Sequence, residues 1–216
     1  MTDDNKYMNG RIVMLLCHLQ VWTNTCCSHP LHGMSPPEVD SPQDVADGTV
    51  PGAKNAAVRK LDHELGIPAS QVPASQFKFL TRLHYWAADT VTHGKKSPWG
   101  EHEIDYVLFF TIPSKDQLTV KPHPDEVDDV KWVTKSKLLE MMDDKSLLFS
   151  PWFRLIAHRW LIPDGGWWDD LAKTMTTDVH CDYVSIHCFD PPMEHMGGGG
   201  DAGPVYSAAL EEGDAS

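Results

Sequence analysis

Residues 53–67 read AKNAAVRKLDHELGI, and this stretch decides the fold prediction. Its apolar residues recur at helical spacing: Ala56, Ala57, Leu61 and Leu65. That spacing predicts a helix over residues 53–65 with one buried face. Gly66 is a typical helix terminator, and Pro68 prevents the helix from resuming.

The periodic segments that follow this helix predict a single α/β or α+β domain. We expect strands at 77–86, 103–112 and 127–133, and helices at 135–142 and 152–160. The second strand contains the continuous apolar run YVLFF at 106–110, which favours a central position in the sheet.

Composition excludes several classes of protein. The chain has 216 residues and a formal net charge of −13, which argues against a nucleic-acid partner because phosphates are bound by Lys and Arg. No apolar run approaches the roughly 18 residues that span a bilayer. The five Cys form an odd count that does not suggest a disulfide framework, so we expect a cytoplasmic protein. We also expect a monomer.

Four zones differ in character. Residues 1–22 form an atypical leader, and Pro and Gly punctuate residues 23–52. The domain is predicted to span 23–175. Residues 176–216 contain eight acids and no Lys or Arg, which predicts an acidic, largely disordered tail.

The first group that could carry chemistry is the loop TNTCCSHP at 23–30. Cys27 lies two residues from His29, so a thiolate activated by an imidazolium is possible. His29 could instead ligate a metal. The structural alternative is a small buried Cys beside an incidental His.

The second group is three acids in alternation, Glu101, Glu103 and Asp105. On a strand they share one face, where they repel one another. They then need a divalent cation, or a proton held by an acid with a raised pKa. A solvated edge strand is the alternative.

The third group is RKLDHELGI at 59–67, which resembles the end of a Nudix box. Arg59, Glu64 and Gly66 match that pattern, whereas Lys60 and His63 stand where the box has acids. Together with the loop TNTCCSHP, the strand WGEHEIDYVLFF and the segment SPWFRLI, the chain resembles type 1 isopentenyl-diphosphate delta-isomerases over roughly residues 21–175.

This resemblance implies a Nudix-like mixed sheet sandwiched by helices and a set of site residues. It implies the catalytic residues Cys27, Glu103, Tyr85 and Trp152. It implies diphosphate contacts at Lys60 or the adjacent Arg59, and Glu64 as a ligand of Mg²⁺. A second divalent metal, Zn²⁺, Mn²⁺ or Mg²⁺, is expected at His29, Glu101 and Glu103.

The implied reaction converts isopentenyl diphosphate to dimethylallyl diphosphate, a step of isoprenoid and sterol biosynthesis. A proton is added to the terminal alkene carbon and another is removed from C2, through a tertiary carbocation. Glu103 with Tyr85 would face Cys27 across the substrate as acid and base, while Trp152 would shield the cation.

The start of the chain departs from the family pattern. Met1–Gln20 lacks the family's usual pair of His ligands, so we expect the first strands to be missing and residues 1–20 to be loosely packed. Two alternatives remain: a Nudix-type pyrophosphohydrolase and an inactive truncated isomerase homologue. His180, Cys181, His187 and Cys188 could also form a zinc site, although their spacing is unusual.

Overall fold

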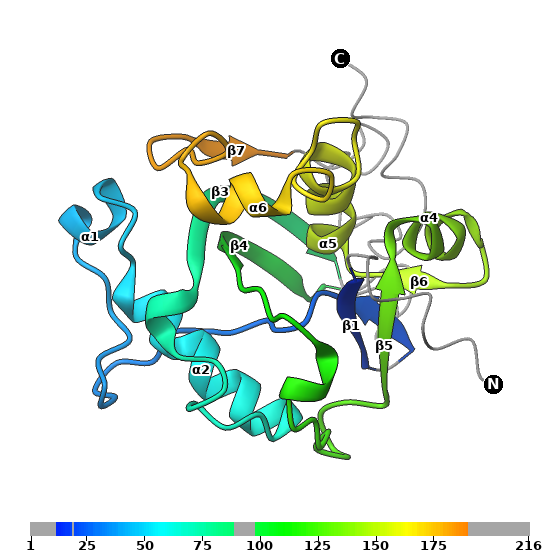
Figure 1. Cartoon of the computed structure of the whole chain (residues 1–216), viewed down its shortest axis with the longest axis horizontal. Coiled ribbons are helices and arrows are strands. Elements are labelled where there is room, and N and C mark those ends of the chain that lie inside the picture. Colours follow the sequence, from blue (N-terminus) through cyan, green and yellow to red (C-terminus); the bar gives the residue numbers. More distant parts are fainter. Residues whose placement is uncertain (1–11, 19, 89–97, 190–216) are drawn as a thin grey trace.

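A computed structural model of the chain describes residues 12–18, 20–88 and 98–189 (Figure 1). The helices are α1 (Pro42–Ala46), α2 (Pro51–Leu65), α4 (Lys135–Asp143), α5 (Pro151–Ile156) and α6 (Leu171–Thr176). The strands are β1 (Ile12–His18), β2 (Val21–Thr23), β3 (Lys78–Ala88), β4 (Gly100–Phe109), β5 (Asp129–Thr134), β6 (Leu148–Phe149) and β7 (Ile186–Cys188). Among the described residues, no helix combines the length and the apolar character needed to cross a membrane.

The strands form two mixed sheets, where one was expected. The first has the order β5-β1-β2-β6 and the second the order β4-β3-β7. β2 pairs in parallel with β6 and β3 with β7, whereas the other pairs are antiparallel. In Figure 1, α2 lies on one side of the β3–β4 pair, and α5 and α6 lie on the other. The α/β fold with mixed sheets and helices is confirmed.

The expectation that residues 1–20 are loosely packed is wrong for β1. This strand pairs with β5 from Ile12, opposite Thr134, to Cys17, opposite Asp129. Leu15 is completely buried in the core. The apolar run of β1 is too short for a membrane but long enough for a strand between two neighbours. The expected leader residues 1–11 and the tail from 190 onward lie outside the described residues.

Helix α2 follows the sequence prediction closely. It begins at Pro51, two residues before the expected start, because proline fits the first turn of a helix. Its buried residues include the four apolar ones that predicted it. Gly66 ends it in the left-handed region at φ 60°, where its N–H donates to the carbonyl of Asp62. The buried face of α2 packs against Phe77 and Leu108.

Strand β4 lies at an edge of its sheet among the described strands, so its predicted central position is wrong. The apolar run has a different cause. Val107 and Phe109 pack into the core that contains α5, whereas Leu108 and Phe110 pack into the core beneath α2. Both faces of this edge strand are therefore covered by helices.

The helix expected over 152–160 is α5 followed by a turn of π-helix at Ala157–Leu161. After α6, β7 extends the second sheet, with His187 opposite Leu83. Strands β1 and β7 lie outside residues 23–175 and pair with strands of that domain.

Candidate active site

The adjacent residues Cys26 and Cys27 face opposite sides of the fold. The Cys26 thiol points to the carbonyl of Ala57 in α2, with Sγ 3.9 Å from that oxygen. Cys26 packs against the core beneath α2, whereas Cys27 packs against the core that contains α5. Because neighbouring side chains of an extended segment alternate, this loop delivers only Cys27 to the side of the β4 carboxylates.

The three alternating acids of β4 share a face with Tyr85. Glu103 is paired in register with Tyr85, Glu101 with Ala87, and Asp105 with Leu83. Tyr85, Ala87 and Leu83 are all buried. The predicted common face is confirmed. The structure also supports the protonated alternative for one acid, since burial, followed by Glu103 and Glu101, raises the pKa of Asp105 to about 7.

Tyr85 joins two of these carboxylates. Its hydroxyl donates to Glu101 Oε2 at 2.9 Å and lies 3.5 Å from Glu103 Oε2. Burial, followed by the surrounding carboxylates, raises the pKa of Tyr85, so the phenol holds its proton. On its other oxygen, Glu103 contacts His29, with Nε2 3.0 Å from Oε1. Glu103 therefore lies between a phenol and an imidazole, two groups that can carry protons.

Trp152 closes the apolar side of this group. Its indole is buried, and its ring centroid lies 5.7 Å from that of Tyr85. The indole N–H donates to Asn24 Oδ1 at 2.9 Å, and the amide of Asn24 donates to the Cys26 carbonyl at 2.6 Å. The cysteine loop and the start of α5 are thus connected through one side chain. Thr23 and Ser150 strengthen the connection with a 2.8 Å hydroxyl contact.

The environment of Cys27 favours the protonated thiol and not an activated thiolate. Burial, followed by the charge of Asp105, raises its pKa. The imidazole of His29 contacts Glu103. The alternative of a thiolate beside an imidazolium does not match this arrangement, because a depressed thiol pKa is what activates such a nucleophile.

The residues expected to bind the second metal are only partly assembled. His29 touches Glu103, and Glu101 reaches Glu103 through the Tyr85 hydroxyl. No group of three or more His, Cys, Asp or Glu side chains in the described part of the chain is arranged to hold a metal ion. The donor set fits imidazole-binding and carboxylate-binding metals chemically, but its geometry does not form a ligand cage. The same finding leaves the four His and Cys residues at 180–188 without support as a zinc site.

A second polar group lies on α2. Glu64 accepts from Lys60, with Oε1 2.9 Å from Nζ, and Glu126 lies 3.5 Å from the same ammonium. Burial raises the pKa of Glu64, although Lys60 opposes the shift. His63, at a position where a Nudix box has an acid, stacks on His123 at 5.8 Å. Glu64 and Glu126 therefore supply two carboxylates around one cation.

Arg59 occupies a different environment from the adjacent Lys60. Its Nε lies 2.6 Å from Glu38 Oε1, and Glu38 is only 3% exposed. Sequence reasoning missed Glu38 and Asn24, because no local pattern distinguishes them. Both act through contacts with residues distant in the chain, at separations of 21 and 128 residues.

Residues 28–153 match the family model of the NUDIX domain. Over 166 residues the chain is 44% identical to a Phaffia rhodozyma protein named isopentenyl-diphosphate delta-isomerase, covering 77% of this chain and 58% of that protein. It is 46% identical over 157 residues to one from Candida albicans, covering 70% and 52%. It is 43% identical over 172 residues to one from Camptotheca acuminata, covering 77% and 64%. The chain thus spans less than two thirds of these relatives.

Proposed function

The chain belongs to the NUDIX domain family, and from that premise we propose that it isomerises isopentenyl diphosphate to dimethylallyl diphosphate. The similarity to curated proteins named isopentenyl-diphosphate delta-isomerase supports this reaction. The single observation that carries the proposal is the placement of Cys27. Its thiol lies on the side of Glu101, Glu103 and Asp105, whereas that of Cys26 packs on α2.

The reaction needs two proton carriers and no nucleophile. One proton is added to the terminal alkene carbon and one is removed from C2, so the substrate's composition does not change. Cys27 would be one carrier, because its raised pKa keeps the thiol protonated. Glu103 would be the other, since it is in contact with both the Tyr85 hydroxyl and the His29 ring. Together these groups would act as an acid on one face of the alkene, which donates the proton to the terminal carbon, and as a base on the other, which receives the proton from C2.

The intermediate is a tertiary cation, and it needs protection from water. Tyr85 and Trp152 would supply aromatic faces, which attract a cation through their π-electrons. Trp152 is held by Asn24 and by the core around α5. An indole fixed in this way loses little freedom when substrate binds, which favours a preorganised site.

The diphosphate would lie toward α2. Mg²⁺ prefers carboxylate oxygens combined with substrate phosphates, and when bound it neutralises the diphosphate charge. Glu64 is the proposed ligand, and Lys60 is the proposed contact to the phosphate oxygens. Arg59 contributes less directly, because its Nε and Nη2 already bind Glu38.

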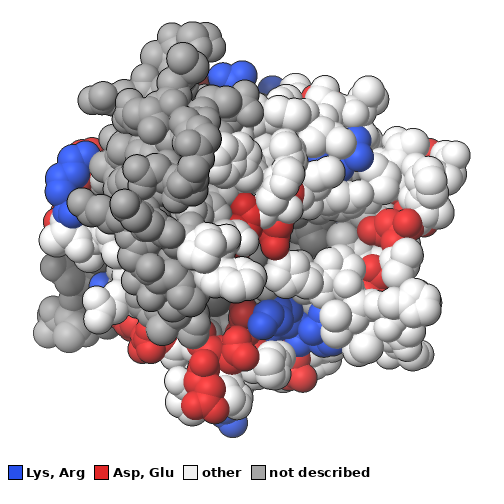
Figure 2. Space-filling view, turned by 180° about the vertical axis from the view of Figure 1, so that it is seen from behind, with Lys and Arg blue, Asp and Glu red and all other residues white. Residues whose placement is uncertain are grey.

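The proposed partner is a small molecule. Figure 2 shows acidic and basic side chains intermixed on the face opposite that of Figure 1, without a continuous basic surface over the described residues. The net charge of −13 agrees with this view. We further propose that the protein acts as a cytoplasmic monomer, which light scattering and fractionation would test.

The test is to incubate the full chain with isopentenyl diphosphate and Mg²⁺ in D₂O. We expect dimethylallyl diphosphate with deuterium in its new methyl group, detected by NMR. A pyrophosphohydrolase would instead release phosphate from nucleoside diphosphate derivatives, which requires more box acids than Glu64. Phosphate release without isomerisation would overturn the proposal, and so would the absence of any turnover by the folded chain.

A further inference from the structure

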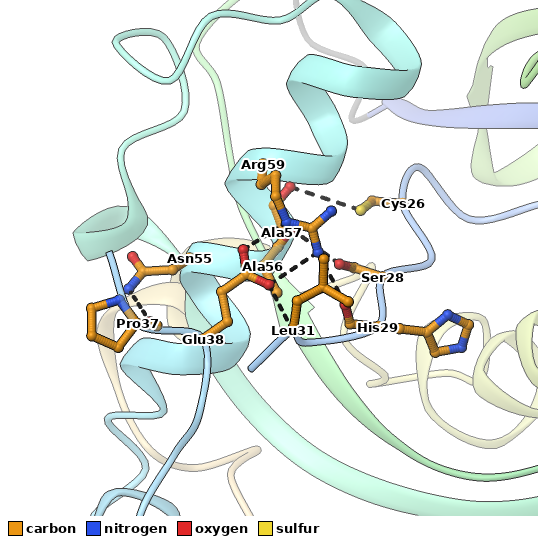
Figure 3. Close-up of polar contacts among 10 residues, drawn as sticks. All are labelled: Cys26, Ser28, His29, Leu31, Pro37, Glu38, Asn55, Ala56, Ala57 and Arg59. Carbon is orange, nitrogen blue, oxygen red and sulfur yellow. Dashed lines mark hydrogen bonds and ion pairs between the residues drawn. The ribbon is translucent and has the colours of Figure 1, made fainter. Parts of the chain in front are cut away.

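The segment after Cys27 is fastened to α2 along most of its length (Figure 3). The Ser28 hydroxyl donates to the Ala56 carbonyl at 3.0 Å. Further along, the Asn55 amide donates to the Pro37 carbonyl at 2.8 Å. Asp40 then accepts from the backbone N–H groups of Gly52 and Ala53 in the first turn of α2. Helix α2 is therefore the support on which this segment is built.

Glu38 is the centre of this attachment. Its carboxylate binds Arg59 through two contacts, Nε to Oε1 at 2.6 Å and Nη2 to Oε2 at 3.0 Å. The same carboxylate accepts from the Leu31 N–H at 2.9 Å. The side chain is buried, so it must keep all these partners to remain ionised. The backbone of Glu38 also passes close to Gly52, where an added Cβ would lie 2.7 Å from the Glu38 carbonyl carbon.

Arg59 connects Glu38 to His29, a residue of the candidate active site. Its Nη2 also donates to the carbonyl of His29 at 3.0 Å. One guanidinium thus holds the backbone at His29 and, through Glu38, the backbone at Leu31. Figure 3 shows the His29 ring pointing away from this network. That ring reaches Glu103 on β4.

We propose that Glu38 and Arg59 form a positioning pair, which sets the place of Cys27 and His29 relative to the carboxylates of β4. The inference rests on the proposed isomerase function and assigns Arg59 a role other than a diphosphate contact. A planar guanidinium suits this role, because it presents several N–H donors in a fixed geometry. The directions of these hydrogen bonds matter as well as the charges, since two of the acceptor and donor groups are backbone atoms.

The test compares Glu38→Gln and Arg59→Lys with the parent chain in steady-state isomerisation, well below the melting temperature. We expect kcat to fall about tenfold or more in both, because a misplacement near 1 Å costs this much or more. KM should change less than about twofold, since neither residue would touch substrate. The control Lys135→Met removes the ion pair with Asp169, far from this segment, and should leave both constants unchanged. A rise in KM with kcat unchanged would overturn the inference and restore Arg59 as a diphosphate contact.

A charge-reversal variant separates the effect of hydrogen-bond direction from the effect of the two charges. In the double variant Glu38→Arg with Arg59→Glu the attraction is kept, but Leu31 N–H and the His29 carbonyl lose their partners. We expect no rescue of kcat relative to Glu38→Gln. Recovery of parental kcat would overturn the inference, because charge alone would then suffice.

Hydrogen exchange provides a readout that does not depend on activity. In Glu38→Gln, backbone amides of residues 26–29 and 31 should exchange at least about tenfold faster, while those of β3 and β4 keep the parental rate. Unchanged exchange in 26–29 and 31 would overturn the inference. If the parent chain fails to isomerise the substrate, the proposed function fails, and this measurement still decides whether the pair positions the loop.

Discussion

The hydroxyl of Tyr85 donates to Glu101 at 2.9 Å, across two neighbouring antiparallel strands. It also lies within 3.5 Å of Glu103, the proposed acid and base. A buried phenol placed between two carboxylates can share its proton with either, so its hydroxyl belongs to the proposed proton path.

Tyr85→Phe removes this hydroxyl and keeps the ring beside Trp152. We expect kcat to fall about 10²-fold, the lower end of what general acid–base groups contribute. KM for isopentenyl diphosphate should change little. The matched control is Tyr106→Phe. Tyr106 lies on β4 opposite Arg82 and therefore on the other face of the sheet. Equal kcat values for Tyr85→Phe and the parent would remove the phenol from the proton path.

The Glu38–Arg59 pair makes stability depend on pH. The hydrogen bond from Arg59 holds the pKa of Glu38 below its ordinary value. A depressed acid pKa contributes stability above the unfolded-state value, about 4.3 for Glu, and loses it as the pH falls through the folded-state pKa. Urea unfolding should therefore show the parent more stable than Glu38→Gln by about 2 kcal/mol at neutral pH.

This difference should begin to shrink below about pH 4.3, where the unfolded chain takes up its proton, and it is lost as the pH falls through the lower folded-state pKa of Glu38. A difference that stays constant down to acidic pH would contradict an ionised Glu38 as its source.

The carboxyl of Asp105 has the opposite effect on the free energy of unfolding. Its pKa is raised to about 7, by burial first and then by Glu103 and Glu101. An acid with a raised pKa costs stability above its unfolded-state pKa, and the cost grows until the pH passes the folded-state value. Asp105→Asn should therefore raise the free energy of unfolding at about pH 8 by about 1–2 kcal/mol, measured with urea.

Asp144→Asn is the control for that substitution. Asp144 accepts hydrogen bonds from Ser146, which lower its pKa, so its replacement should not stabilise the protein. A destabilised Asp105→Asn would show that the carboxylate at this position is favourable and not strained.

The dependence of the rate on Mg²⁺ tests the role proposed for Glu64. After treatment with EDTA and dialysis, isomerisation should depend on added Mg²⁺. Glu64→Gln should raise the Mg²⁺ concentration for half-maximal rate about tenfold, equivalent to about 1.4 kcal/mol of binding. Glu140→Gln removes a carboxylate of an exposed pair with Lys137 and should have no effect. An unchanged Mg²⁺ dependence in Glu64→Gln would exclude Glu64 as a ligand.

Local patterns predicted those parts of the molecule that local physics determines. Helix α2 was predicted within two residues of its start because its apolar spacing and Gly66 act over neighbouring turns. The shared face of Glu101, Glu103 and Asp105 follows from strand alternation alone.

Long-range contacts account for what the sequence did not predict. The sequence predicts a loose leader where β1 lies, because its partner, β5, is more than a hundred residues away. The apolar run of β4 predicts a central strand, although helices on both faces explain it equally well. Glu38 has no sequence signal, because its importance depends on the position of Arg59 in space.

The central claim is that Cys27 carries a proton and Cys26 does not. The most direct measurement is kcat of Cys27→Ala beside Cys26→Ala, with isopentenyl diphosphate and Mg²⁺ saturating and folding checked by circular dichroism. The structure predicts a loss of about 10³-fold or more for Cys27→Ala, because one proton carrier is removed. It predicts less than about a fivefold change for Cys26→Ala, whose thiol faces α2 and not the carboxylates. Equal losses in the two variants, or the larger loss in Cys26→Ala, would contradict the account.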